Sequence, residues 1–407
     1  MLGIELSELM RSGENSGVEF KSDDVHTEGL AKVISAFLNF EGGRILLGVE
    51  DSGEVRGLSR KPKEAEEWVM QVCRDCIQPP IIPYWETMPW GESSMVGVIT
   101  LPADSPDKPY KAKRGSSWFT FMRAGTLSHE ATREEEARLY QSSGLMRYDL
   151  RPVIGSTLAD LDRRRLRNYF RDKRKQEIPA DDNTAEWEIL LINTDIMLED
   201  RGRIMPTVAG MLLFGKSPNR FLPQAGISAT AFQGEEKDYD ARERGVLRGP
   251  IVPFLNETGE LQESGLIEQA IDFVKRNIKI ASRIDEGGRR IDRWDYPLET
   301  IREAAVNAIV HRDYTITVKD IELYIFSNRL EVLSPGRLPN TVTVEKMKRG
   351  YRASRNELIK DVMRDYNYIE ATGMGVPRKI IKGMLEHNGK EPDLIEEETQ
   401  FLLRLWK

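Results

Sequence analysis

The feature that most restricts the fold is a strand–helix–strand succession near the start of the chain. Residues 18–21 alternate apolar and charged side chains, as a half-exposed strand does. Apolar residues then recur at helical spacing over 30–38, a pair of glycines ends this helix, and residues 44–49 form a buried strand. Further strand and helix patterns continue to about residue 147. The first part of the chain is therefore predicted to be an α/β domain.

The remaining sequence is long enough for two more units. A chain of 407 residues corresponds to two or three domains of ordinary size. We expect a winged-helix-like linker domain over 148–249 and a last domain over 250–407, after a first domain over 1–147. The stretch 238–249, with mixed charges and two glycines, is predicted to be a flexible connection, and 261–278 a helix. The predicted fold class is α+β multidomain.

Composition excludes several classes of protein. The net charge of −7 excludes a globally basic nucleic-acid coat, although it leaves room for a local basic site. No apolar run approaches the roughly 18 residues of a membrane span, and the first residues lack the pattern of a signal peptide. Two cysteines are too few for a disulfide framework. These observations predict a soluble, cytoplasmic protein without a membrane partner.

One segment concentrates positive charge in this acidic chain, and a cluster of this kind is typical of phosphate binding. It contains a single acid, Asp172. The alternative is a solvated helix whose exposed ion pairs contribute little. The predicted nucleic-acid-binding residues are Arg163, Arg164, Arg167, Arg171, Lys173, Arg174 and Lys175.

Three carboxylates and a lysine of the first domain are a candidate catalytic group. Glu19 and Lys21 are two residues apart on a strand, so their side chains share a face. Asp51 lies at the end of another strand, and with Glu14 the four side chains converge if the strands are adjacent. Three carboxylates suit Mg²⁺ or Mn²⁺, and a lysine beside them aligns water or offsets phosphodiester charge. The alternative is an ordinary solvated strand face.

The same region resembles a known family. Residues 18–21, 34–43, 45–51 and 121–126 are similar in order and spacing to the Schlafen/AlbA-type domain. In the Schlafen branch, the resemblance implies a metal-dependent nuclease acting on structured RNA such as tRNA. The catalytic acidic trio then maps onto Glu14, Glu19 and Asp51. Other relatives are DNA-binding transcriptional regulators, so the resemblance covers both a nuclease and a binder.

A helix over 298–311 is the notable element of the last domain. Glu303, Asn307 and His311 fall at i, i+4 and i+8 and form one polar stripe. Such a stripe is usually the solvent-exposed face of a helix. Here it is followed by Ser334-Pro335-Gly336 and by a glycine pair at 373 and 375.

These features resemble the GHKL ATPase superfamily in its divergent form that accompanies Schlafen/AlbA-type domains. The resemblance implies that Glu303 polarises a water and Asn307 holds Mg²⁺, while Gly336, Gly373 and Gly375 line an ATP site. Ser334 stands where the superfamily has the aspartate that reads adenine, which puts adenine recognition in question. The alternative for this domain is a degenerate fold used for dimerisation.

Two functional hypotheses follow. The first is a metal-dependent endonuclease, on RNA rather than DNA, that serves in defence and carries a regulatory nucleotide-binding-like domain. The second is a non-catalytic, DNA-binding and ATP-binding transcriptional regulator. Both need basic residues, but only the nuclease needs the acidic trio.

Overall fold

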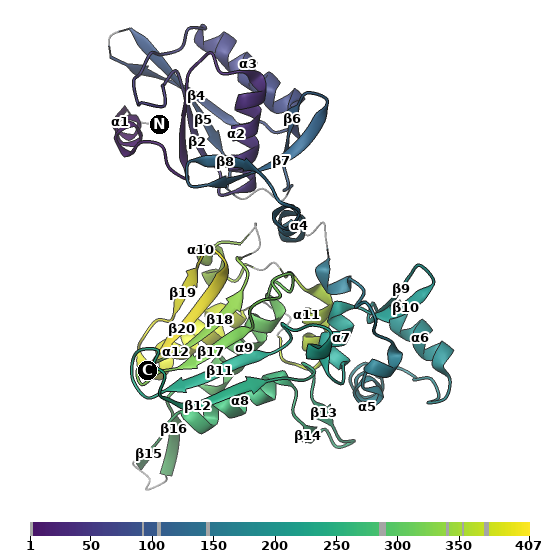
Figure 1. The fold of residues 1–407 in the computed structure, drawn as a ribbon. Coiled ribbons are helices and arrows are strands. Elements are labelled where there is room, and N and C mark those ends of the chain that lie inside the picture. Colours follow the sequence, from purple (N-terminus) through teal and green to yellow (C-terminus); the bar gives the residue numbers. More distant parts are fainter. Residues whose placement is uncertain are drawn as a thin grey trace. The chain divides into compact units, whose positions relative to one another are not determined.

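A computed structural model describes residues 3–91, 93–103, 107–143, 147–284, 290–338, 342–351, 354–369 and 374–407 (Figure 1). The chain divides into two compact units, 1–146 and 147–407, and each is described by itself. Helices and strands are mixed in both units, which confirms the predicted α+β multidomain class. Within the described ranges, no helix is long and apolar enough to cross a membrane.

The first unit contains two four-stranded sheets. The first sheet has the order β1-β2-β5-β4, in which β1 and β2 are parallel and the other pairs antiparallel. Its strands are β1 (Val18–Lys21), β2 (Gly43–Leu47), β4 (Tyr84–Trp90) and β5 (Ser94–Leu101). The second sheet has the order β3-β6-β7-β8. Its strands are β3 (Ile77–Gln78), β6 (Lys111–Arg114), β7 (Ser117–Ala124) and β8 (Leu127–Glu130).

Helix α2 (Thr27–Asn39) is the buried centre of this unit. Its apolar side chains pack on residues of β2 and β5 on one side and of β6 and β7 on the other. This explains why the helix carries apolar residues around most of its circumference. At its end, the buried Asn39 donates to the carbonyls of Tyr110 (2.8 Å) and Phe121 (2.9 Å), which fixes the helix on the second sheet.

Three further helices complete the first unit. Leu6 of α1 (Gly3–Ser12) joins Val18, Phe20 and other apolar residues on the face of the first sheet opposite α2. Helix α3 (Pro62–Asp75) packs its apolar side against α2. Helix α4 (Arg133–Ser142) follows the second sheet.

The second unit is built on a six-stranded sheet of order β12-β11-β17-β18-β20-β19. Strands β11 and β17 are parallel, and every other neighbouring pair is antiparallel. The strands are β11 (Ile227–Phe232), β12 (Ala241–Leu247), β17 (Ile321–Ile325), β18 (Arg329–Pro335), β19 (Asp393–Glu396) and β20 (Gln400–Trp406).

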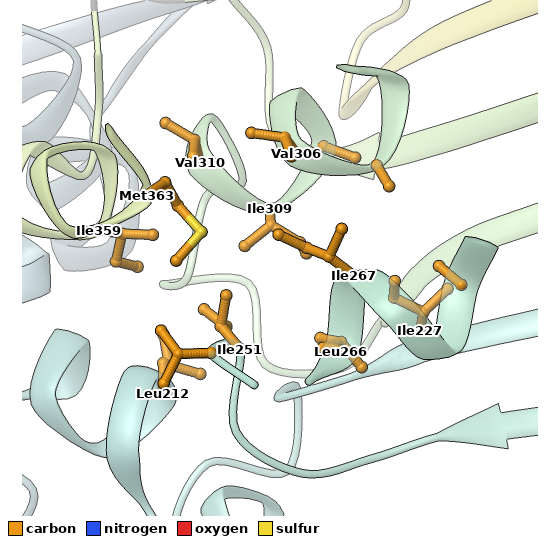
Figure 2. Packing of buried hydrophobic residues seen from close by; sticks show 14 of the residues in the cluster. Leu212, Ile227, Ile251, Leu266, Ile267, Val306, Ile309, Val310, Ile359 and Met363 are labelled. Atoms are coloured by element: carbon orange, nitrogen blue, oxygen red, sulfur yellow. The ribbon is translucent and has the colours of Figure 1, made fainter. Parts of the chain in front are cut away.

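Helices α8 (Leu266–Asn277) and α9 (Leu298–Val310) pack side by side on one face of this sheet. Figure 2 shows part of the core, in which Ile267 of α8, Ile309 of α9 and Met363 lie close to one another. Met363 belongs to α11 (Glu357–Asp365). Burying each such side chain contributes about 1.5–3 kcal/mol, so this core holds the helices firmly on the sheet. The remaining helical segments are α10 (Val344–Lys348), the π-helical η5 (Gly375–Lys382) and α12 (Gly383–Asn388).

The segment before the sheet forms a smaller layer of the same unit. It contains α5 (Arg163–Arg167) with its π-helical continuation η3 (Asn168–Lys173), α6 (Thr184–Asn193), the hairpin β9 (Met197–Asp200)–β10 (Arg203–Pro206) and α7 (Val208–Phe214). Short 3₁₀ turns occur at 148–150, 158–160 and 218–220. Two more hairpins are β13 (Phe254–Leu255)–β14 (Leu261–Glu263) and β15 (Ile280–Ile284)–β16 (Arg290–Trp294). The hydrophobic core includes residues from both sides of the domain boundary predicted at 249.

Two local predictions were wrong. Residues 241–247 form strand β12, not a flexible connection, because they pair along β11 at the edge of the sheet. The helix predicted over 261–278 begins only at Leu266, since 261–263 pair as β14. Among the described residues, each of these strands pairs with one neighbouring strand, and its exposed polar residues resemble those of a loop or a helix surface.

Candidate functional site

The parallel pairing of β1 and β2 creates the first site. The carboxyl ends of parallel strands lie at the same edge of a sheet, where functional groups are commonly placed. Lys21 is the last residue of β1, and Asp51 lies in the turn shortly after β2. Glu14 precedes β1 and folds back along it, because its Oε1 accepts a hydrogen bond from the Phe20 amide at 2.9 Å.

The structure brings all four sequence-predicted residues of the first domain together. The Lys21 Nζ lies 2.8 Å from Glu19 Oε1, 3.5 Å from Asp51 Oδ1 and 3.9 Å from Glu14 Oε1. Burial lowers the pKa of Lys21, but the hydrogen bond and charge of Glu19, aided by Asp51 and Glu14, outweigh burial and raise it. Three carboxylates from separate segments therefore surround one ammonium group, which stays charged.

A residue that the sequence analysis did not single out also belongs to this cluster. Arg123 of β7 has a fully buried side chain, and its guanidinium lies 2.8 Å from Glu19 Oε2. It donates to the carbonyls of Asn15 (2.6 Å) and Ser16 (3.1 Å) and stacks on the ring of Phe37. Glu19 is thus held between two cations. We expect Glu19→Ala to cost stability, because it would leave the Arg123 charge buried without its partner.

The donor set of the cluster fits a hard divalent cation in chemistry, although Lys21 occupies its centre. All candidate ligands are carboxylate oxygens, which Mg²⁺ and Mn²⁺ prefer. In the described ranges, no three acidic, histidine or cysteine side chains are spaced as a metal site. A cation therefore fits the trio only if the Lys21 ammonium withdraws and the carboxylates close in. Asp51 is 81% exposed, so the cluster is open to solvent on that side.

The second site is a pocket of about 220 Å³ in the second unit. It lies between α9, the end of β18 and the start of η5, and apolar side chains such as Val332 and Phe401 form much of its wall. Four of the five predicted nucleotide-site residues line it, and the fifth, Gly373, lies outside the described residues. The four are Glu303, Asn307, Gly336 and Gly375.

Ser334 and Gly336 shape the pocket at the end of β18. Gly336 has φ +110°, and a Cβ there would lie 2.5 Å from the Asp313 Cβ and 2.8 Å from an Arg355 nitrogen. Only glycine fits this position. The buried Ser334 hydroxyl donates to the Ala308 carbonyl at 2.8 Å. With its proton used in this way, Ser334 offers a ligand only lone pairs.

Glu303 is enclosed from three directions. Asn307 donates to its Oε1 at 3.1 Å, and the Lys379 Nζ lies 4.0 Å from its Oε2. Gly375 packs so closely that a Cβ would come within 1.9 Å of Glu303 Oε1. The i, i+4 stripe predicted on this helix is therefore the floor of a pocket. His311 lines the same pocket, and burial, with Arg355 and Lys360 nearby, lowers its pKa to about 4.

The basic segment carries less free charge than its sequence suggests. Arg164 pairs with Asp162 (3.0 Å) and Glu263 (2.7 Å), and Arg171 pairs with Asp172 (2.8 Å). Arg163 and Arg167 of the segment also contact other side chains.

Arg167 pairs with Asp181, and Arg163 stacks on the ring of Trp187. The members at the end of the segment, Lys173, Arg174 and Lys175, form no ion pair with any described residue. That the segment binds nucleic acid stays a prediction. The cations that remain available for phosphates are those at its end, Lys173, Arg174 and Lys175.

Family models match three stretches of the chain. Residues 14–132, which include the whole carboxylate cluster, match the model described as Schlafen, AlbA_2. Residues 137–227 match a domain of unknown function, DUF8451. Residues 319–405 match HATPase_c_4, described as "Putative ATP-dependent DNA helicase recG C-terminal". The last match includes Ser334, Gly336 and Gly375 but starts after α9, so Glu303 and Asn307 lie outside it.

Two solved structures show weak similarity to this chain. The crystal structure of the DIP2311 protein from Corynebacterium diphtheriae is 19% identical with a TM-score of 0.45, over 99% of this chain and 79% of that one. The solution structure of the N-terminal domain of a putative ATP-dependent DNA helicase RecG-related protein from Nitrosomonas europaea has 20% sequence identity and a TM-score of 0.25, over 31% of this chain and 90% of that one. At these scores neither likeness establishes a common fold. No curated protein matches the chain.

The fold and the matches define a multidomain α+β protein whose domain types are connected with nucleic acids. The chain carries a Schlafen/AlbA_2 domain at 14–132 and a RecG-type C-terminal domain at 319–405, which confirms the resemblance seen in the sequence.

Proposed function

We propose that this protein is a divalent-metal-dependent endonuclease that cleaves structured RNA such as tRNA. One observation supports the proposal most strongly: Glu14, Glu19 and Asp51 each place a carboxylate oxygen within 3.9 Å of a single Lys21 Nζ. The three acids outnumber the two cations, Lys21 and Arg123, that the described residues place beside them, so the cluster carries a surplus of negative charge that a divalent cation would offset. The partial exposure of the cluster gives a phosphodiester access to it.

The three carboxylates would hold the cation once Lys21 withdraws. A bound Mg²⁺ or Mn²⁺ supplies Lewis acidity and an activated water. Lys21, once displaced from the trio, would offer its positive charge to a phosphate oxygen. Arg123 would fix the orientation of Glu19 from behind, as hydrogen-bonded partners of metal-binding carboxylates do.

A cleavage assay tests this function directly. The full-length protein is incubated with tRNA, single-stranded DNA and duplex DNA, each with Mn²⁺, Mg²⁺ or EDTA. We expect cleavage of tRNA with a divalent cation and none with EDTA. Intact substrates in all metal-containing reactions would contradict the proposal.

A non-catalytic DNA-binding regulator is the second candidate. It is favoured by the charge balance at Glu19, whose two carboxylate oxygens face Lys21 and Arg123. Such pairing also serves simply to anchor strands. Binding of duplex DNA that is unaffected by EDTA and leaves the DNA intact would support this candidate.

The pocket of the second unit is the proposed regulatory ATP site. Asn307 and Glu303 offer oxygen ligands for Mg²⁺, and the lone pairs of Ser334 can accept a hydrogen bond from an adenine amine. Calorimetric titration with ATP and Mg²⁺ tests the site. Asn307→Ala should lose the Mg²⁺-dependent part of the affinity, and Ser334→Asp should keep adenine selectivity. Heat of binding that is absent at millimolar ATP would leave the domain as a scaffold, used for example in dimerisation.

A further inference from the structure

A second, more open cavity of about 430 Å³ lies on the other side of α9 in the second unit. Hairpin β13–β14 contributes Leu255 and Leu261, helix α8 contributes Ile271, and the turn after α11 contributes Tyr366 and Tyr368. We call this cavity the tyrosine groove. It shares no lining residue with the proposed ATP pocket.

Three cations line the tyrosine groove: Lys173 of η3, Lys275 of α8 and Arg302 of α9. None of them forms an ion pair with a described residue, whereas most arginines of the nearby basic segment do. The groove also contains the carboxylates of Glu268 and Asp272.

The two acids do not offset the three cations. The carboxylate of Glu268 accepts from the Gly265 amide at 3.0 Å and from the Tyr368 hydroxyl, which hold it in place while it keeps its negative charge. Asp272 is the other acid of the described lining, so the three cations exceed the two acids by one charge. Unpaired cations gathered around one cavity attract an anionic ligand.

A buried polar group without a partner points in the same direction. Tyr366 is only 7% exposed, and its hydroxyl has no hydrogen-bond partner in the part of the chain that the structure describes. Its ring stacks between those of Tyr169 and Tyr368, with centroids 6.0 and 6.3 Å away, so it has little freedom to turn. A buried hydroxyl that stays unpaired costs about 1–3 kcal/mol. Tyr366 lines the groove, so a ligand oxygen that reached its hydroxyl would remove this cost.

The position of Lys173 connects the groove with the basic segment. Its Nζ lies 5.2 Å from the centroid of the Tyr366 ring, and Arg174 and Lys175 follow it at the exposed end of the segment. The unpaired charge of the segment thus continues directly into the groove. A ligand with regularly repeated negative charges fits such a path better than a single small anion.

We propose that the tyrosine groove binds the phosphodiester backbone of a nucleic-acid strand, with phosphates paired to Lys173, Lys275 and Arg302. The Tyr366 hydroxyl donates to a phosphate oxygen. The inference rests on the proposed nucleic-acid function, but it places a contact surface in the second unit, outside the Schlafen/AlbA_2 domain. Contacts of this kind position a strand without reading its sequence.

The test is the affinity of the full-length protein for a short fluorescently labelled RNA, measured by anisotropy in EDTA so that no cleavage takes place. The variant is Lys275→Gln/Arg302→Gln. The control is Arg244→Gln/Lys390→Gln, which removes two exposed cations that form no ion pair with a described acidic side chain and instead donate to main-chain oxygens of Tyr239 and Lys407. We expect the groove variant to bind at least about tenfold more weakly at low salt. The slope of log affinity against log salt should fall by about 1.4, or 0.7 for each lost phosphate contact.

Tyr366→Phe separates a binding role from a structural one. Because the hydroxyl has no hydrogen-bond partner among the described residues, its removal should leave the melting temperature unchanged or raise it, yet weaken RNA binding several-fold. Competition with inorganic phosphate, ATP and unlabelled RNA identifies the source of the phosphate, and only the RNA should compete at micromolar concentration. Equal competition by ATP or phosphate would overturn the assignment to a nucleic-acid strand.

If the groove variant and the control variant had the same affinity and salt slope, the groove proposal would be overturned. The proposed function would still stand in that case, provided that the wild type binds RNA. A wild type that binds no RNA would contradict both.

Discussion

Arg123 should be the residue on which the stability of the first unit depends most. We predict that Arg123→Met destabilises this unit by about 3–5 kcal/mol, the usual cost of removing one member of a buried ion pair. The side chain is fully buried and pairs with Glu19 at 2.8 Å, and its loss also leaves the carbonyls of Asn15 and Ser16 without this donor. Methionine keeps much of the volume, so the effect reports on charge and hydrogen bonding rather than on a cavity.

Hydrogen exchange of the full-length protein, followed by mass spectrometry, measures this cost where it acts. Peptides that contain β1 and β2 should exchange about a thousandfold faster in the variant, since each 1.4 kcal/mol corresponds to a factor of ten. Arg114→Met is the matched control, because Arg114 forms an exposed pair with Glu130 at 3.1 Å and should contribute less than about 1 kcal/mol. Exchange in Arg123→Met within threefold of wild type would refute the structural role of Arg123.

Two further predictions concern the pocket of the second unit. The pKa of His311 is lowered to about 4 in the folded protein, whereas in the unfolded chain the imidazole takes up a proton near its ordinary pKa of 6.5. The unfolded state therefore binds more protons below pH 6.5. The free energy of unfolding should be full above pH 6.5 and fall as the pH drops towards 4. In urea unfolding, the free energy of unfolding should fall by at most about 2 kcal/mol between pH 7 and 5. The variant His311→Gln should lack this fall. A variant with the same pH dependence as the wild type would show that His311 is not buried as neutral imidazole. Gly375→Ala should abolish calorimetric ATP binding, because its Cβ would lie 1.9 Å from Glu303 Oε1, whereas Gly234→Ala, with open space around it, should bind ATP as the wild type does; equal affinities would place the ligand elsewhere.

Local patterns in the sequence were sufficient to predict the strands and the helix that position the carboxylate cluster. The alternation at Glu19 and Lys21 and the strand end before Asp51 determine which way these side chains point, and the glycine pair before β2 marks the end of α2. Their convergence depends on β1 and β2 being neighbours, which the sequence left open. The structure shows this pairing.

Partners from distant segments could not be predicted. Arg123 lies far along the chain from Glu19, and only the packing of β7 on α2 brings the two together. The same holds for Arg164, whose partner Glu263 lies in β14. Strand β12 was missed because its exposed positions carry charge, which in an edge strand prevents pairing with other chains but looks like a loop in the sequence.

Asp51→Asn gives the most direct test of the central claim. Its carboxylate is 81% exposed and pairs with Lys21 at 3.5 Å, so its loss should leave stability unchanged while removing one ligand of the proposed cation. The exposed Glu54, replaced by glutamine, is the matched control. The measurement is the initial rate of Mn²⁺-dependent tRNA cleavage by the full-length protein. The nuclease account predicts a rate at least about a hundredfold lower for Asp51→Asn and an unchanged rate for Glu54→Gln. Equal rates for Asp51→Asn and the wild type would contradict it.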